Sequence, residues 1–182
     1  MDTLQQTKDA RFEQVMREYG TRILRLVCFF VKDPSLAEDI TQDVFVKVYR
    51  HLADFRGESA MHTWIYRIAV NECKGYLRSW SFRNLLLKPL ADCTAERTVE
   101  AEVLANLERE GIVRQVMKLA PAYRQVIALH YYAELSTAEI AEILGTSEGA
   151  VRTKLHRARQ QLKALMTREE GKEWMWNNRS AT

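Results

Sequence analysis

Residues that interrupt helices are scarce in this chain of 182 residues, which has seven glycines and three prolines. Inside a helix, glycine costs about 1 kcal/mol and proline about 3 kcal/mol, so their scarcity favours helical structure. Cysteine is scarce as well: Cys28, Cys73 and Cys93 are widely spaced, and no CxxC pair occurs. An odd number of cysteines at this spacing argues against a disulfide framework and against a cysteine-rich zinc site.

Long apolar runs are also lacking. No window of the sequence approaches the ~18 uninterrupted apolar residues that a membrane-spanning helix needs. The first residues, MDTLQQTKDARFEQ, contain no basic segment followed by an apolar stretch, which is the pattern of a secretory signal. We therefore expect no membrane insertion and a cytoplasmic location.

Catalytic signatures are missing too. The sequence has no GxxxxGK, HExxH or GxSxG motif, and the histidines His51, His62, His130 and His156 stand singly on expected helices. A metal site that combined His62 and Cys73 with a third group would have no ligand spacing to support it. We therefore expect no enzyme activity, no cofactor and no metal, and a helical enzyme or metal-binding module is the weakest functional hypothesis.

Charge is unevenly distributed, although the formal net charge is only +3. Residues 33–43 include four acidic residues and no basic one, whereas residues 147–168 include six basic residues and one acidic residue. Such segregation predicts separate surfaces for separate partners.

Apolar residues recur at steps of three and four along most of the chain, which predicts helices and almost no strand. We expect helices over residues 11–31, 34–52 and 60–80, then over 99–119 and 121–132. The predicted fold is all-α, with two small helical domains joined by a flexible linker. The predicted boundaries follow the weakening of this periodicity: an N-terminal domain over 1–80, a linker over 81–99, a C-terminal domain over 100–168 and a tail over 169–182.

The segment from residue 135 to 166 carries the pattern of a helix-turn-helix. Ser136 or Thr137 can cap a helix, and Glu139 completes a capping box with Ser136. Gly145 suits the left-handed conformation that ends a helix, and Thr146 or Ser147 can cap the helix that follows. A short turn at glycine followed by a basic helix is typical of DNA-binding domains.

The second helix of this motif, residues 146–166, has an apolar and a basic face. Its inward side chains are expected to be Val151, Leu155, Ala158, Leu162 and Leu165. Its outward side chains are expected to be Arg152, Thr153, His156, Arg157 and Arg159. The first turns of such a helix enter the major groove, where an arginine can donate two parallel hydrogen bonds to guanine. The alternative is a solvated basic helix in an ordinary bundle, which the cap and turn pattern disfavours.

The helix over residues 60–80 combines cations with aromatics. Arg67, Asn71, Lys74 and Arg78 share one face, Trp64 precedes them, and Trp80 and Phe82 follow. Aromatic rings that stack bases, together with cations that neutralise phosphates, suit single-stranded DNA. A tryptophan at helical spacing is more often part of a core, so this pattern alone is a weak signal.

Four segments in order resemble the extracytoplasmic-function (ECF) sigma factors of bacterial RNA polymerase. They are AEDITQDVFVKVYRHL, FRGESAMHTWIYRIAVNECKGYLR, LAPAYRQVI and GAVRTKLHRAR, at residues 37–52, 55–78, 119–127 and 149–159. The resemblance covers about residues 10–168. It implies two helical domains joined by a linker, binding to the clamp region of core RNA polymerase, and recognition of promoter DNA. It also implies an anti-sigma protein, often membrane-bound in this family, as an inhibitory partner.

The resemblance also assigns roles to individual residues. It implies that Asp39, Gln42, Asp43 and Phe45 bind core polymerase, with core packing an equally good interpretation of Phe45. It implies that the −10 element is recognised and melted by Arg56, Ser59, His62, Arg67, Asn71 and Lys74. It implies that the −35 element is read by the outward face of the helix over residues 146–166. His62 and His156 stand where the family often has other residue types, so the promoter sequence does not transfer.

A second hypothesis is a dimeric helix-turn-helix regulator that binds duplex DNA without polymerase. Such a regulator should bind DNA alone, whereas a sigma factor should need core polymerase. The order of the clamp, loop and melting segments favours the sigma factor.

Overall fold

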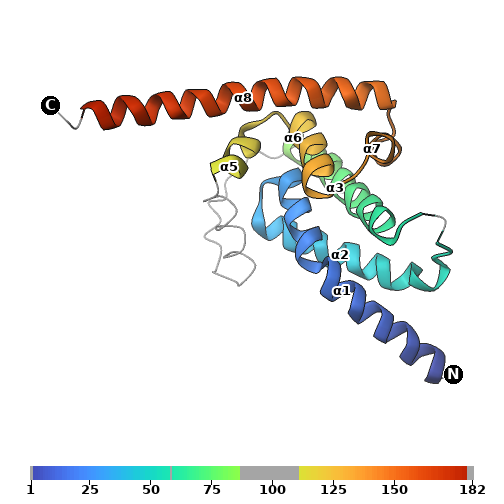
Figure 1. Cartoon of the computed structure of the whole chain (residues 1–182). Coiled ribbons are helices and arrows are strands. Elements are labelled where there is room, and N and C mark those ends of the chain that lie inside the picture. Colours follow the sequence, from blue (N-terminus) through green and yellow to red (C-terminus); the bar gives the residue numbers. More distant parts are fainter. Residues whose placement is uncertain (1, 58, 87–110, 180–182) are drawn as a thin grey trace. The chain divides into compact units, whose positions relative to one another are not determined.

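A computed structural model describes residues 2–57, 59–86 and 111–179, with side chains described over 8–57, 59–79 and 111–167. All regular structure in these ranges is helical, in agreement with the predicted all-α class (Figure 1). The chain divides into two compact units, Met1–Leu104 and Ala105–Thr182. Within the described ranges, every helix is too short or too polar to cross a membrane.

The first unit contains three long helices, α1 (Asp2–Val31), α2 (Pro34–His51) and α3 (Met61–Leu86), with a short 3-10 helix at Leu52–Asp54. The Asp33 carboxylate accepts a hydrogen bond from the Leu36 backbone amide at 3.0 Å and so caps α2. Pro34 occupies the first turn of α2, where its missing amide proton costs nothing. The break predicted between the first two helices therefore has a local cause.

The core of the first unit lies where the three helices meet. Its fully buried side chains include Ile23, Ile40, Val44, Ile65 and Cys73. Burial of an aliphatic side chain of this size contributes about 1.5–3 kcal/mol, so this contact stabilises the unit. Ile40 and Val44 on α2, and Ile65 and Cys73 on α3, lie at the helical spacing of apolar residues seen in the sequence.

Met16 lies at helical spacing among the apolar residues of α1, yet it does not face the core. Its side chain is 40% exposed, whereas Val15 is buried. Consecutive residues of a helix lie about 100° apart around its axis, so Met16 turns away from the core that Val15 faces. The exposed thioether becomes part of the surface between α1 and α2.

In the first unit, helix α1 begins earlier and helix α3 ends later than the sequence predicted. Helix α3 continues past residue 80 to Leu86, because neither glycine nor proline interrupts residues 81–86. The first six residues of the predicted linker are therefore helical, and residues 87–99 lie outside the described ranges. The predicted helix over 99–119 is described only from Gly111 onward.

The second unit contains α5 (Gly111–Lys118), α6 (Pro121–Ile127), α7 (Thr137–Leu144) and α8 (Glu148–Arg179). The helix predicted to run from Pro121 to Tyr132 is α-helical only to Ile127 and continues as a single π-helical turn over Ala128–Tyr132. Helices α5, α6 and α7 all pack on α8. The predicted tail has no clear period, yet its backbone continues α8 as far as Arg179.

The core of the second unit gathers around the first half of α8. Leu129, Leu135, Ile140, Val151 and Leu155 are all buried there. The predicted inward face of α8 is thus confirmed at Val151 and Leu155, and the opposite face is left to solvent.

Candidate nucleic-acid and protein interfaces

The predicted helix-turn-helix forms with its predicted caps. The Ser136 hydroxyl oxygen accepts from the Glu139 backbone amide at 3.2 Å, and the Glu139 carboxylate accepts from the Ser136 backbone amide at 2.9 Å. Gly145 ends α7 in the left-handed region at φ 66°, and the Ser147 hydroxyl oxygen accepts from the Ala150 amide at the start of α8. Local side-chain chemistry therefore sets the turn that positions α8.

The exposed face of α8 brings together the five side chains predicted to face DNA. All five are exposed: Arg152, Thr153, His156, Arg157 and Arg159. On the opposite side of the same turns, Val151 and Ala158 are completely buried. Burial of the apolar face fixes the rotation of α8, and so fixes which side chains face outward.

One acidic residue stands within this basic surface, at the first residue of α8. The Glu148 carboxylate accepts from the Thr137 hydroxyl of α7 at 2.6 Å and from the Arg152 guanidinium at 2.7 Å. These hydrogen bonds, that from Thr137 first, lower the pKa of the Glu148 carboxyl. Arg152 is therefore held from one side, although 68% of its side chain is exposed.

Arg159 is also held by a neighbour. Its Nε donates to the Tyr131 hydroxyl at 2.7 Å, and its guanidinium carbon lies 5.6 Å from the centre of the Tyr131 ring. Tyr131 is 56% exposed and lies in the π-helical turn, a conformation often found at functional sites. Sequence reasoning missed this tyrosine, because no motif or periodicity links two residues so far apart in the chain.

The loop between α2 and α3, with the first turns of α3, carries the residues predicted to take the −10 element. Arg56 and Asn71 are exposed, whereas Ser59, His62, Arg67 and Lys74 are half-buried. Gly57 within the loop adopts φ 74°, a left-handed conformation that favours glycine. The loop and the helix thus place all six side chains where solvent can reach them.

Aromatic side chains support this loop. The rings of Phe55 and Trp64 lie 5.1 Å apart, and the Arg11 guanidinium lies 5.9 Å from the centre of the Phe55 ring. Trp64 therefore braces the loop. The pKa of Lys74 is lowered by its burial and by the nearby Arg78. Trp80 and Phe82 lie outside the residues whose side chains are described.

The four residues predicted to bind polymerase divide into two pairs. Asp39 and Gln42 are exposed on α2. Asp43 is half-buried and accepts a hydrogen bond from the Tyr76 hydroxyl of α3. Phe45 is only 5% exposed and packs edge-on against Phe12, with ring centres 6.4 Å apart.

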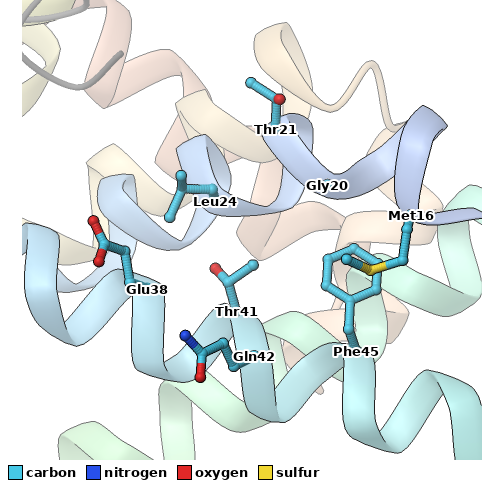
Figure 2. A pocket seen from close by; sticks show the side chains of 8 residues that line it. All are labelled: Met16, Gly20, Thr21, Leu24, Glu38, Thr41, Gln42 and Phe45. Carbon is cyan, nitrogen blue, oxygen red and sulfur yellow. The ribbon is translucent and has the colours of Figure 1, made fainter. Parts of the chain in front are cut away.

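A groove of about 360 Å³ runs between α1 and α2 beside these residues. Figure 2 shows its two walls, with one set of side chains from α1 and the other from α2. The groove is lined by Met16, Gly20, Thr21, Leu24, Glu38, Thr41, Gln42 and Phe45. A neighbouring hollow shares Met16, Gln42 and Phe45 and adds Val46, which is 46% exposed. The surface thus combines an apolar floor with amide and carboxylate groups at its edge.

Two family models match the chain in the order of its two units. The model of sigma-70 region 2 matches residues 15–82, and the model of sigma-70 region 4 matches residues 109–162. The chain is 33% identical to the RNA polymerase sigma-H factor of Pseudomonas aeruginosa over 91% of each chain. It is 31% identical to the ECF RNA polymerase sigma-E factor of Escherichia coli K12 over 88% of each chain.

The chain belongs to the ECF sigma factors. As a sigma-70 family factor it is a non-catalytic subunit that binds core RNA polymerase and directs it to promoter DNA. This identification decides against the dimeric regulator and against the helical enzyme. The fold of the sigma factor is also that of a solved structure, the sigma factor RpoE in complex with the anti-sigma factor NepR from Bartonella quintana. That likeness has a TM-score of 0.69 at 20% identity and covers 86% of this chain and 97% of the other.

The sigma factor has surface residues that its sequence did not disclose. Glu148 holds Arg152 and Tyr131 holds Arg159. Met16 and Val46 supply the apolar part of the α1–α2 surface. A carboxylate within a basic segment was visible in the sequence as the one acid among six bases. The exposure of Met16 and Val46 had no such signal, because an apolar residue at helical spacing predicts burial.

Proposed function

We propose that the two units divide promoter recognition between them. The exposed face of α8 reads the −35 element in the major groove, with Arg152 and Arg157 as base readers. The loop before α3 and the face with Arg67 and Asn71 take an unpaired base of the −10 element. The single observation that carries this proposal is the basic face of α8, whose rotation is fixed by completely buried Val151 on its other side.

The physical chemistry of the −10 surface supports strand opening rather than duplex binding. Extrusion of a base costs a few kcal/mol, which stacking and hydrogen bonds to the base edge must return. The Asn71 side chain is exposed and offers both a donor and an acceptor. Arg56 and Arg67 supply the positive charge that a displaced strand requires.

The groove between α1 and α2 is the proposed contact with the polymerase clamp. Asp39 and Gln42 offer polar groups beside an apolar floor, which suits a basic helical partner with apolar side chains. Phe45 contributes to this contact as the wall of the groove, while its ring also packs within the unit. Asp43 contributes its carboxylate to the same contact, and the hydrogen bond that it accepts from Tyr76 joins α2 to α3.

Two further proposals follow from family membership and from the similar fold. An anti-sigma protein inhibits this sigma factor, as the Bartonella relative of the same fold binds one. The protein works in the cytoplasm, where core polymerase and chromosomal DNA are found.

Run-off transcription with purified core polymerase tests the proposed function. Reactions with and without the protein are run on a library of genomic DNA fragments, and transcripts are mapped to their starts. We expect starts that depend on the protein and share upstream sequence at two positions. Arg152→Ala should remove the shared −35 sequence, whereas Gln14→Ala on the exposed side of α1 serves as the matched control and should change nothing. The absence of any protein-dependent start would contradict the proposal.

A further inference from the structure

Glu148 joins the two helices of the helix-turn-helix through a single oxygen atom. Its Oε1 accepts from Thr137 on α7 at 2.6 Å and from the Arg152 Nη2 one turn along α8 at 2.7 Å. Neither partner is a backbone group, so the arrangement is not a helix cap. It fixes the position of a carboxylate and of an arginine with respect to each other.

The other carboxylate oxygen of Glu148 has no hydrogen-bond partner among the residues whose side chains are described. The side chain is 40% exposed, and it stands in the first turn of α8. In a helix-turn-helix, the first turns of the second helix reach the base edges. The free oxygen is therefore placed where it could meet a base.

The charge of Glu148 decides which base edge it can meet. Hydrogen bonds from Thr137 and Arg152 favour the ionised carboxylate, which lowers the pKa of the group and leaves it an acceptor only. In the major groove, hydrogen-bond donors are found only on the amino groups of cytosine and adenine. Guanine and thymine offer acceptors at the corresponding positions, and a carboxylate is repelled by them.

We propose that Glu148 is a specificity-determining residue for the −35 element: it positions the Arg152 guanidinium and accepts a hydrogen bond from a base amino group beside the base that Arg152 reads. This inference rests on the proposed function, in which α8 enters the −35 major groove. Arg152 then donates through its remaining N–H groups to guanine, and the pair reads two neighbouring positions as one unit.

A structural role for Glu148 alone predicts a different response to mutation. If the carboxylate only stabilised α8, its loss would weaken the binding of every DNA sequence. If it reads sequence, its loss removes a negative charge that faces the DNA phosphates and frees Arg152 to contact them. Affinity for unrelated DNA should then rise while sequence preference falls. The two roles therefore predict opposite changes in the affinity for unrelated DNA when Glu148 is replaced: a decrease for the structural role and an increase for the reading of sequence.

Thr137 provides a second, independent test. Thr137→Val removes the hydroxyl that donates to Glu148 and keeps the shape of the side chain, whereas Thr137→Ser keeps the hydroxyl. If the tether to α7 positions the carboxylate, Thr137→Val should relax the sequence preference and Thr137→Ser should retain it. Rescue by serine is not expected from a role in packing.

The experiment uses the full chain bound to core polymerase and a pool of duplex DNA with a randomised −35 region. Bound DNA is sequenced for the wild type, Glu148→Ala, Glu148→Gln, both Thr137 variants and Arg152→Ala. Dissociation constants are then measured on the preferred sequence and on a scrambled one at two salt concentrations. Far-ultraviolet circular dichroism confirms that each variant is folded.

We expect the wild type to prefer cytosine or adenine beside a guanine. The sequences of the bound DNA then show whether the cytosine or the adenine amino group donates to Glu148. In Glu148→Ala and Glu148→Gln, preference at that position should fall roughly tenfold. In the same variants, the affinity for the scrambled sequence should rise. The slope of log affinity against log salt concentration should steepen by the equivalent of about one phosphate contact.

Unchanged preferences in both Glu148 variants, with Arg152→Ala altering them, would overturn this inference and leave the proposed function intact. Weaker binding to preferred and scrambled DNA alike in the Glu148 variants would also overturn it, because that result indicates a structural role. Unchanged preferences in Arg152→Ala would overturn both the inference and the proposed reading by α8.

Discussion

The Tyr76 hydroxyl of α3 donates a hydrogen bond to Oδ2 of Asp43 on α2, with 2.5 Å between the two oxygen atoms. The pKa of the Tyr76 hydroxyl is raised, mainly by this hydrogen bond and to a smaller extent by partial burial. The same bond connects a residue in the proposed polymerase-binding segment of α2 to α3, the helix whose other residues are proposed to bind DNA. The Lys47–Glu72 ion pair, at 2.6 Å, makes a second connection between the same helices.

Loss of the Tyr76 hydroxyl should therefore weaken the first unit without removing its polymerase contact. A hydrogen bond to a charged group contributes about 1.5–3 kcal/mol when it is sheltered, and less when it is partly exposed as here. We expect Tyr76→Phe to lower the free energy of unfolding by about 1 kcal/mol in a urea titration. Affinity for core polymerase should be unchanged. A loss of core affinity as large as that in Asp39→Ala would show that Tyr76 itself contacts the polymerase.

The first unit should lose stability in alkaline solution. Burial raises the pKa of the Cys73 thiol and of the Tyr19 hydroxyl to about 12 in each case. Because both groups hold their protons more tightly in the folded state, the folded state binds more protons than the unfolded state above about pH 9. Their contribution is thus complete at lower pH and is lost as pH rises through the folded pKa of about 12.

The measurement is the free energy of unfolding in urea at about pH 8 and about pH 10.5, with the reducing agent held constant. We expect a decrease at the higher pH, and a smaller decrease in Tyr19→Phe, which lacks one of the two groups. A pH response in Tyr19→Phe identical to that of the wild type would exclude the tyrosine as a contributor.

The exposed thioether of Met16 should matter for polymerase binding more than for folding. Its side chain lines both hollows between α1 and α2 and is already 40% exposed. Substitution at such an exposed position usually changes stability by less than about 0.5 kcal/mol. We expect Met16→Glu to weaken core polymerase binding about tenfold or more, because an interfacial apolar contact is replaced by a charge. Gln14→Ala, a change at another exposed residue of α1, is the matched control. Equal affinities of the two variants for core polymerase would show that Met16 is not part of the interface.

Two glycines of the helix-turn-helix should respond in opposite directions to alanine. Gly145 has φ 66°, whereas Gly149 lies inside α8, and at both positions an added Cβ would meet no atom within 4 Å. Gly145→Ala should therefore destabilise the second unit by about 1–2 kcal/mol through backbone strain alone. Gly149→Ala should stabilise it by a few tenths to about 1 kcal/mol. Thermal melting of both variants provides the comparison, and destabilisation by Gly149→Ala would show an unexpected need for glycine there.

Features with a local cause could be predicted from the sequence. The capping box at Ser136, the glycine turn at Gly145 and the buried side of α8 each depend on residues within one or two helical turns. The −35, −10 and polymerase residues came from family resemblance, and their individual roles stay predictions. Features that depend on tertiary contact could not be predicted, such as the Tyr131–Arg159 hydrogen bond and the exposure of Met16. The length of α8 was missed for another reason, since a helix without an apolar period leaves little signal in the sequence.

We propose that DNA docking and strand opening depend on different surfaces of the sigma factor. The Asn71→Ala variant, assembled with core polymerase on a promoter that the wild type opens, separates these two steps. Footprinting of the −35 region reports docking, and permanganate reactivity of unpaired thymines near −10 reports opening. We predict nearly normal protection at −35 with much reduced permanganate reactivity at −10. An equal loss of both signals would contradict the claim.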